Sequence, residues 1–269
     1  MHTWVLFLLG LLLSLGLRAQ SNPDYFQLAT ARYSSGDYVG AIRFYDQALK
    51  ANPNDADALF NRALARHRSG DLKGALKDYT ACLDVQPRDA EAYFNRAAVH
   101  QELNQYAEAI ADLTDAIELN PTDIDARLNR GYVRVLLQDY RGAIQDYDYV
   151  IEMHPFSYQA YYNRGNAKRA SIDHEGAIAD YGHVIRLTQK FAPAHVARGY
   201  THLLLGRHQA AVDDLNLALE ISPYDGEALC YRGRARAALG QTEAACADLR
   251  KAHELFYDRA LEFLQELCP

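Results

Sequence analysis

Residues 56–89 read ADALFNRALARHRSGDLKGALKDYTACLDVQPRD, and residues 90–123 read AEAYFNRAAVHQELNQYAEAIADLTDAIELNPTD. Both segments carry the sequence FNRA near the start and a single proline near the end. Laid against itself at this 34-residue spacing, the chain shows the same segment without insertion over residues 22–55, 56–89, 90–123, 124–157, 158–191, 192–225 and 226–259. A fixed period of this length indicates a repeat architecture, in which each unit stacks on its neighbours.

Three columns of the repeat hold side chains of similar size. Counting Asn22 as position 1, position 8 is alanine or glycine, position 20 is alanine throughout, and position 24 is tyrosine or leucine. Two helices approach closely only where the facing side chains are small, so these columns predict a tight crossing within each repeat. Proline at position 32 and glycine–aspartate near position 15 of several repeats end the helices. Each repeat is therefore expected to be a helical hairpin.

These columns resemble the tetratricopeptide repeat, with a small residue at position 8, alanine at 20, an aromatic residue or leucine at 24, and proline at 32. The resemblance covers residues 22–259. It implies an all-α fold, a right-handed α-solenoid of seven helical hairpins. Residues 260–269 have no turn and partner helix after them, so we expect a C-terminal capping helix there.

The first residues differ from the repeats. Residues 4–17 are apolar or small without interruption, and Ala19 follows at a suitable cleavage position. This run is shorter than the roughly 20 apolar residues that span a bilayer, and it is typical of a signal-peptide core. We predict a signal peptide over residues 1–19 and an exported protein, periplasmic or secreted. An uncleaved membrane anchor is the alternative, because the residues before the run carry little positive charge.

Composition and motifs argue against several classes of function. The formal net charge of −7 disfavours nucleic acid, whose phosphates require a basic surface. No zinc-protease HExxH, phosphate-binding glycine loop or nucleophile elbow is present, so no catalytic residue, metal, cofactor or small-molecule substrate is predicted. Cys82 falls at a small, buried repeat position. Cys230, Cys246 and Cys268 could supply one disulfide in an exported protein, and their spacing leaves the pairing open.

Two further columns carry opposite charges. Position 7 is leucine in the first repeat and arginine in the others, and position 23 is phenylalanine in the first repeat and aspartate in the others. The alternative pairs each aspartate with the arginine of the next repeat, but that arrangement would leave Arg62 without a carboxylate. We therefore predict a structural ladder of ion pairs within repeats, in preference to an anion-binding stripe: Arg62–Asp78, Arg96–Asp112, Arg130–Asp146, Arg164–Asp180, Arg198–Asp214 and Arg232–Asp248. Position 11 is basic throughout, and its role stays open.

The resemblance implies that the first helix of each hairpin lines a concave face. Position 6 of that helix is asparagine in four consecutive repeats, and an amide that donates and accepts can hold an extended peptide backbone. This row resembles the ladder in the repeat domain of O-linked N-acetylglucosamine transferase. Aromatic neighbours are typical of interaction surfaces. The predicted partner-binding residues are Asn61, Asn95, Asn129, Asn163, Phe60, Phe94, Tyr132, Tyr162 and Asn166. The alternative is that the asparagines bond inside the array.

The sequence therefore predicts a non-catalytic scaffold that binds a protein or peptide segment in its concave groove. One alternative is an assembly subunit of a cell-envelope complex that docks by its convex face. Another is a non-catalytic subunit of an enzyme complex. Contact with a membrane is expected only if the N-terminal segment is retained. The family's chaperone-tail clamp is not expected, because no repeat has lysine at position 5.

Overall fold

The computed structural model describes residues 24–268, which form fifteen α-helices. In chain order they are α1 (Tyr25–Ser34), α2 (Tyr38–Ala51), α3 (Ala56–Arg68), α4 (Leu72–Val85), α5 (Ala90–Glu102), α6 (Tyr106–Leu119), α7 (Ile124–Leu136), α8 (Tyr140–Met153), α9 (Tyr158–Ala170), α10 (His174–Leu187), α11 (Ala192–Leu204), α12 (His208–Ile221), α13 (Gly226–Ala238), α14 (Thr242–Glu254) and α15 (Arg259–Leu267).

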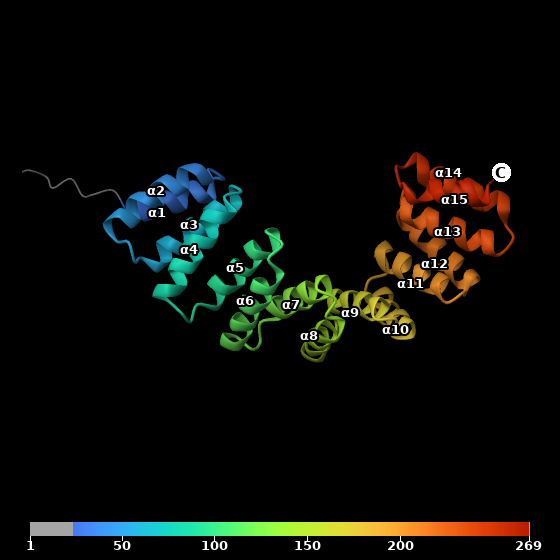
Figure 1. Cartoon of the computed structure of the whole chain (residues 1–269), viewed down its shortest axis with the longest axis horizontal. Helices are drawn as coiled ribbons and strands as arrows, with labels where there is room; N and C mark the ends of the chain where they lie inside the picture. Colours follow the sequence, from blue (N-terminus) through green and yellow to red (C-terminus); the bar gives the residue numbers. More distant parts are fainter. Residues whose placement is uncertain (1–23, 269) are drawn as a thin grey trace, which may run out of the picture.

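Consecutive helices pair into antiparallel hairpins, and the hairpins follow one another along an open arc with α1 and α15 at its opposite ends (Figure 1). Odd-numbered helices of successive hairpins contact each other, such as α9 with α11 and α11 with α13. No pair of even-numbered helices in residues 24–268 makes a comparable contact. The odd-numbered helices therefore line the concave side. The predicted all-α solenoid is confirmed.

Aspartates at two repeat positions start most of the helices. The Asp71 carboxylate accepts from the backbone N–H of Gly74 at 3.0 Å as α4 begins. The Asp89 carboxylate accepts from Ala92 N–H at 3.0 Å as α5 begins. A side-chain cap of this kind satisfies a backbone donor that the first helical turn leaves without a partner. The repeated aspartates thus set where both helices of a hairpin begin.

The small and large columns meet in the centre of each hairpin. The alanines of position 20 are fully buried, and the tyrosines and leucines of position 24 are at most 1% exposed. In the fourth and fifth repeats the fit is so close that only glycine is accommodated at position 8. A Cβ atom at Gly131 or Gly165 would lie 2.7 Å from the ring of Tyr147 or Tyr181, respectively. The two columns therefore fix the distance between the helices of a hairpin.

The arginines of position 7 and the aspartates of position 23 form two parallel hydrogen bonds within each hairpin. In the second repeat, Arg62 Nε donates to Asp78 Oδ2 at 2.8 Å and Nη2 donates to Oδ1 at 2.7 Å. The same two bonds join the other five predicted pairs. The aspartates are 1–6% exposed. This planar two-bond geometry is the strongest form of a carboxylate–guanidinium contact.

A second basic side chain, from position 11, faces the same aspartate. Arg66 Nη1 donates to Asp78 Oδ2 at 2.8 Å, and Lys168 Nζ lies 3.0 Å from Asp180 Oδ2. Where position 11 is histidine, the contact is longer, as at His202, whose Nε2 lies 3.8 Å from Asp214 Oδ2. The basic column at position 11, which sequence reasoning left without a role, thus supplies the second partner of the buried carboxylate.

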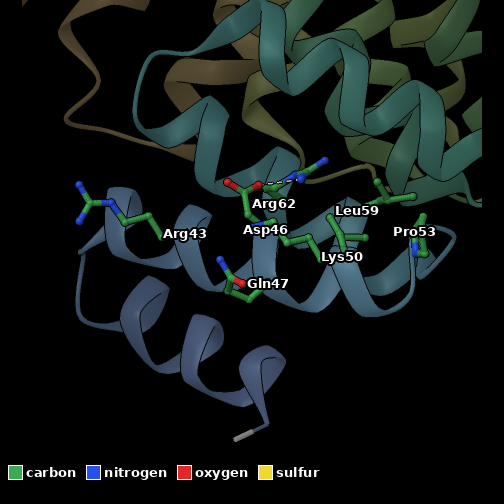
Figure 2. A pocket seen from close by; sticks show the side chains of 8 residues that line it. Arg43, Asp46, Gln47, Lys50, Pro53, Leu59 and Arg62 are labelled. Carbon is green, nitrogen blue, oxygen red and sulfur yellow. Dashed lines mark hydrogen bonds and ion pairs between the residues drawn. The ribbon is translucent and has the colours of Figure 1, made fainter. Parts of the chain in front are cut away.

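Most of the same arginines also reach back to the preceding repeat. Figure 2 shows Arg62 extending to Asp46 of the first repeat, where its Nη1 donates to Oδ1 at 2.7 Å. The acceptor always comes from position 25 of the preceding repeat: Asp46, Thr80, Thr114, Asp148 and Asn216. The exception in the series is Arg198, which faces Gly182 and finds no side-chain acceptor there. Each complete site therefore links three helices and two repeats.

Burial and hydrogen bonding oppose each other at these sites. Burial alone would lower the pKa of Arg62, but its bonds to Asp78 and Asp46 outweigh burial and raise that pKa. Burial alone would raise the pKa of Asp214, but the neighbouring His195, whose Nδ1 lies 3.5 Å from Oδ1, and the two hydrogen bonds from Arg198 hold that pKa below its ordinary value. Both groups therefore remain charged at neutral pH. A charge in such a site is stable only while its partners are present.

The C-terminal helix α15 closes the array over α14 and α13. It begins at Arg259, one residue earlier than expected, and a disulfide between Cys246 of α14 and Cys268 ties its end to the last repeat. Cys82 and Cys230 are buried and free. None of the helices described here has the length and apolar character needed to cross a membrane. The segment predicted as a signal peptide, residues 1–19, lies outside the described residues.

The buried carboxylates give a first prediction. Replacing Asp146 with alanine removes the buried carboxylate that Arg130 and Arg134 both bind, so we expect a loss of about 3–5 kcal/mol in the free energy of unfolding. The matched control is Asp148→Ala, because Asp148 also bonds an arginine but is 53% exposed. That control should cost about 0–1 kcal/mol. Urea unfolding followed by circular dichroism measures the free energy of unfolding of both variants. Equal losses would show that burial of the carboxylate adds nothing to the cost of removing it.

The missing acceptor beside Arg198 gives a second prediction. A Cβ atom at Gly182 would meet Arg198 Nη1 at an ordinary contact distance of 3.6 Å, so the site has room for a side chain. We expect Gly182→Asn to raise the free energy of unfolding by about 1 kcal/mol, through a new hydrogen bond and the loss of a helix glycine. The control is Gly182→Ala, which removes the glycine without adding an acceptor.

Alanine is the better helix former, so an asparagine variant at least as stable as the alanine variant requires the new bond to contribute. An asparagine variant that is clearly less stable than the alanine variant would contradict the view that an acceptor at position 25 stabilises the contact with the next repeat. Thermal and urea unfolding of the three proteins, compared side by side, provide this measurement.

Candidate functional site

The concave groove is the surface formed by the odd-numbered helices α3 to α13. The predicted asparagines lie half-buried in it, one each on α3, α5, α7 and α9. Asn61 Nδ2 donates to the carbonyl oxygen of Asp57 at 2.8 Å, and Asn95 Nδ2 donates to that of Glu91 at 2.8 Å. Each of these two amides therefore uses one of its N–H groups in a hydrogen bond to its own helix. Their carbonyl oxygens remain able to accept from a partner.

The other two asparagines differ from this pattern. Asn129 and Asn163 have no comparable bond to their own helices within residues 24–268. Their amides therefore remain able both to donate and to accept. The row is thus divided, because the internal bonding considered as an alternative occupies one of the two Nδ2 hydrogens in the second and third repeats and neither in the fourth and fifth.

The predicted aromatic residues lie along the same groove with unequal exposure. Phe60 is half-buried and contacts Tyr79 edge to face, with 5.8 Å between ring centres. Phe94 is half-buried and packs on the core of the third repeat. Tyr132 is 51% exposed. Tyr162 packs edge to face on Phe191, with 5.3 Å between ring centres. The first two therefore form part of the wall, whereas much of the Tyr132 side chain is exposed to solvent.

Groove residues of the last three repeats enclose a small hollow of about 180 Å³, which we call the Arg169 hollow. A cavity of about 150 Å³ holds a benzene molecule, so this space fits a single side chain. Two of the predicted residues, Tyr162 and Asn166, lie in its wall. The full lining is Tyr162, Asn166, Arg169, Pro193, Val196, Ala197, Tyr200, Asp225, Glu227 and Tyr231.

A buried tyrosine hydroxyl organises one side of this hollow. Tyr181 reaches through the hairpin, donates its hydroxyl proton to Asn166 Oδ1 at 2.8 Å, and accepts from Arg169 Nε at 3.3 Å. Burial raises the pKa of Tyr181 to about 12, so the hydroxyl stays protonated at neutral pH. Asn166 accepts through its oxygen, and its Nδ2 group lies beside the Tyr162 hydroxyl. The guanidinium of Arg169 lies over the ring of Tyr200, 5.3 Å from its centre.

The acidic residues of the hollow are already engaged on the opposite side. Glu227 Oε1 accepts the hydroxyl proton of Tyr231 at 2.8 Å. Asp225 caps α13, where it accepts from the backbone N–H of Ala228 at 3.0 Å. Tyr231 in turn stacks on Tyr200, with 4.4 Å between ring centres. Neither carboxylate lies within ion-pair distance of Arg169, so donors and acceptors face each other across an open space.

Sequence reasoning did not select four residues of this hollow. Arg169, Tyr200, Glu227 and Tyr231 occupy positions 12, 9, 2 and 6 of three different repeats. Each of these positions belongs to the concave helix, which is the signal that could have found them. The columns themselves are variable, however, and only the superhelical curvature brings the four side chains together.

Other hollows lie elsewhere on the array. The one in Figure 2, of about 430 Å³, lies between α2 and α3 and is lined by Arg43, Gln47 and Lys50 beside the Asp46–Arg62 bond. A larger one, of about 540 Å³, includes Leu128 of α7 and the 82% exposed Phe156. Within the described chain, no group of three or more histidine, cysteine, aspartate or glutamate side chains gathers as a metal site would require.

Comparison with known families decides the classification. Models described as "Tetratricopeptide repeat" match residues 27–92, 90–123, 128–188 and 192–225. The chain belongs to the tetratricopeptide repeat family. A comparison with curated protein sequences finds no match.

Solved structures show the same fold. A tetratricopeptide repeat protein from Parabacteroides merdae is 23% identical with a TM-score of 0.68, and the match covers 90% of this chain and 95% of that one. YrrB, described as a TPR protein with an unusual peptide-binding site, is 22% identical over 69% of this chain and 95% of its own, with a TM-score of 0.60.

PilW, described as a widely conserved type IV pilus biogenesis factor, is 22% identical with a TM-score of 0.63. That match covers 76% of this chain and 94% of PilW. At these identities the likeness concerns the fold alone. Proteins of this repeat family mediate protein–protein interactions, and the family points to a protein or peptide partner for this chain.

Proposed function

We propose that this protein is a scaffold that receives an extended segment of a partner protein in its concave groove. The observation that carries the proposal is the alignment of half-buried asparagine amides on α3, α5, α7 and α9 along one continuous face. An extended chain exposes unpaired backbone N–H and C=O groups along its length, and amides spaced along a groove can satisfy both.

The division within the asparagine row refines this proposal. Asn61 and Asn95 keep the amide oxygen and one Nδ2 hydrogen for backbone groups of the partner. Asn129 and Asn163 keep the oxygen and both Nδ2 hydrogens. The exposed ring of Tyr132 and the Arg169 hollow lie further along the same face and would contact partner side chains. Backbone contacts would give affinity, and these side-chain contacts would give specificity.

Two observations bear on the setting in which such a scaffold would work. The Cys246–Cys268 disulfide is of a kind that persists in oxidising compartments and is rare in a reducing cytosol. It supports the proposal that the protein is exported, to the periplasm or beyond. Among proteins of the same fold, YrrB is described by its peptide-binding site, which supports a peptide as the occupant of the groove.

A second candidate is an assembly subunit that docks by the edge where successive repeats join. Phe156 and Tyr224, on two of the turns between repeats, are 82% and 76% exposed. Large exposed aromatic residues are favoured at interaction surfaces. PilW, of the same fold, is described as a biogenesis factor. If the protein docks by this edge, substitutions in the groove should leave binding of the partner unchanged.

The test compares groove and outer-face variants in capture from an envelope extract of the host. Changing Asn95 and Asn129 together to alanine should reduce capture of the groove partner about tenfold or more, because two backbone contacts are lost. The matched control changes Gln47 and Gln145 to alanine. Both are exposed on even-numbered helices, so their loss should leave capture unchanged.

Circular dichroism first establishes that all the variants remain folded. Equal capture by the groove and control variants would contradict the proposal. Loss of capture in a Phe156→Ala, Tyr224→Ala variant would then point to the edge surface as the docking site.

A further inference from the structure

We propose that the junction between the fifth and sixth repeats is a hinge, about which the sixth and seventh repeats and the cap move as one body relative to the first five repeats. Hinges in proteins are formed by a few residues in loops or at helix ends that absorb a change in backbone angle. This hinge belongs to the array itself, whichever partner the groove receives.

The turn between these two repeats lacks the residues that restrain the other turns of its kind. Position 32 is Gln189 there, whereas the other five junctions have proline. The residue before α11 is Phe191, which provides no side-chain cap in the described structure, whereas aspartate or serine caps the first helix after every other junction. Proline restricts the backbone of a turn, and a cap fixes where the helix begins. Both restraints are missing from one turn.

A backbone hydrogen bond is missing from the same turn. At the preceding junction, Ser157 N–H donates to the carbonyl oxygen of His154 at 3.0 Å. The equivalent bond closes the turns at Asp55, Asp89, Asp123 and Asp225. Among the described residues, Phe191 N–H makes no such bond to Thr188. The backbone that joins the fifth and sixth repeats is therefore held by fewer bonds than the backbone at the other junctions.

The arginine ladder is interrupted at this junction as well. Arg198 faces Gly182, whereas the arginine at each of the other five junctions donates to a side chain of the preceding repeat at 2.6–3.2 Å. In the described chain, the side-chain hydrogen bonds of Arg198 go to Asp214 of its own hairpin. An ion pair between Arg207 and Glu175 does join the two repeats, but both side chains are well exposed. An exposed pair of this kind contributes little to stability.

Apolar contact remains at the junction and provides a pivot. The ring of Phe191 packs edge to face on Tyr158 and Tyr162 of the fifth repeat, with 5.6 and 5.3 Å between ring centres. Attraction between apolar surfaces is non-directional. The rings can therefore turn on one another and stay in contact, whereas a two-residue hydrogen bond or a proline turn would resist the same rotation.

The repeats beyond the hinge are held together. At the junction of the sixth and seventh repeats, Pro223 lies in the turn and Asp225 caps α13. Asn216 of the sixth repeat accepts from Arg232 of the seventh at 2.9 Å. The disulfide then ties the cap to the seventh repeat. Each of the junctions among the first five repeats likewise has its proline, its cap and its arginine link, so movement is concentrated at one place.

The Arg169 hollow lies across the hinge. Tyr162, Asn166 and Arg169 come from the fifth repeat, and the rest of the lining comes from the sixth and seventh repeats. The guanidinium of Arg169 reaches over the ring of Tyr200 on the far side. Rotation at the hinge therefore changes the width of the hollow and of the groove around it. A segment that contacts both walls would favour one hinge angle over the others.

Distances between two nitroxide spin labels, measured by double electron–electron resonance, test the hinge. Labels on Gln145→Cys and Asp213→Cys span it. The control pair, Lys77→Cys and Gln145→Cys, is also two repeats apart at the same repeat position, and all three native side chains are exposed. Cys82 and Cys230 are buried, so the labels attach at the introduced positions. We expect a broader distance distribution for the pair across the hinge than for the control pair.

Restoring the missing restraints should remove this extra width. Gly182→Asn supplies an acceptor for Arg198, and Gln189→Pro supplies the proline. Thr188 already has the extended backbone that a residue before proline requires, with φ −138° and ψ 97°, close to the −136° and 92° of Asn52 before the first such proline. The double variant should narrow the distribution across the hinge to that of the control pair. Gln189→Ala, in the same turn, should leave it broad.

Two results would overturn the hinge. One is an equal width for the two label pairs in the array with its native turn. The other is a broad distribution that the folded double variant leaves unchanged. Circular dichroism establishes the folding of each variant. If the double variant does not fold, the comparison of the two label pairs with the native turn still decides.

Discussion

The structure depends on a buried aspartate carboxylate that recurs in six of the hairpins. Position 23 places it between the two helices of its own repeat, where an arginine and a second basic residue bind it. The same arginine reaches to the preceding repeat in five of the six cases. One charged site therefore fixes the angle within a hairpin and the stacking between hairpins. Because the charges are largely withdrawn from water, each partner is needed to offset the desolvation of the others.

The concave groove is a consequence of this stacking. The arginines of position 7 and the asparagines of position 6 are neighbours on the same helix, so the ladder that fixes each hairpin also fixes the spacing of the asparagine row. Small residues at positions 8 and 20 let the helices approach, and a bulky residue at position 24 fills the remaining space. In the fifth repeat that residue, Tyr181, passes its hydroxyl through to the groove and orients Asn166 and Arg169. The core and the candidate binding surface are thus joined by one side chain.

Much of the fold could be predicted from the sequence, because the residues that determine it recur at the same position of each repeat. The period, the small and large positions and the pairing of Arg62 with Asp78 follow from residues that recur at fixed spacing. The link between repeats was not foreseen, since position 25 varies among aspartate, threonine, asparagine, glycine and arginine and forms no recognisable column.

The Arg169 hollow could not be predicted from the sequence for a related reason. Arg169 is the single arginine of its column, and its neighbours come from two later repeats that only the curvature of the array brings near. The internal bonds of Asn61 and Asn95 were likewise beyond the sequence, which offers the same residue type whether or not its amide turns back on its own helix.

Photo-crosslinking from single positions on the two faces tests the central claim most directly. A benzophenone amino acid would replace Tyr132, which projects into the groove, or Gln145, which is exposed on α8. With the captured partner present, the account predicts a covalent adduct from position 132, mapping to an extended segment of the partner, and none from position 145. An adduct from position 145 with none from position 132 would place the partner on the outer face and contradict the account.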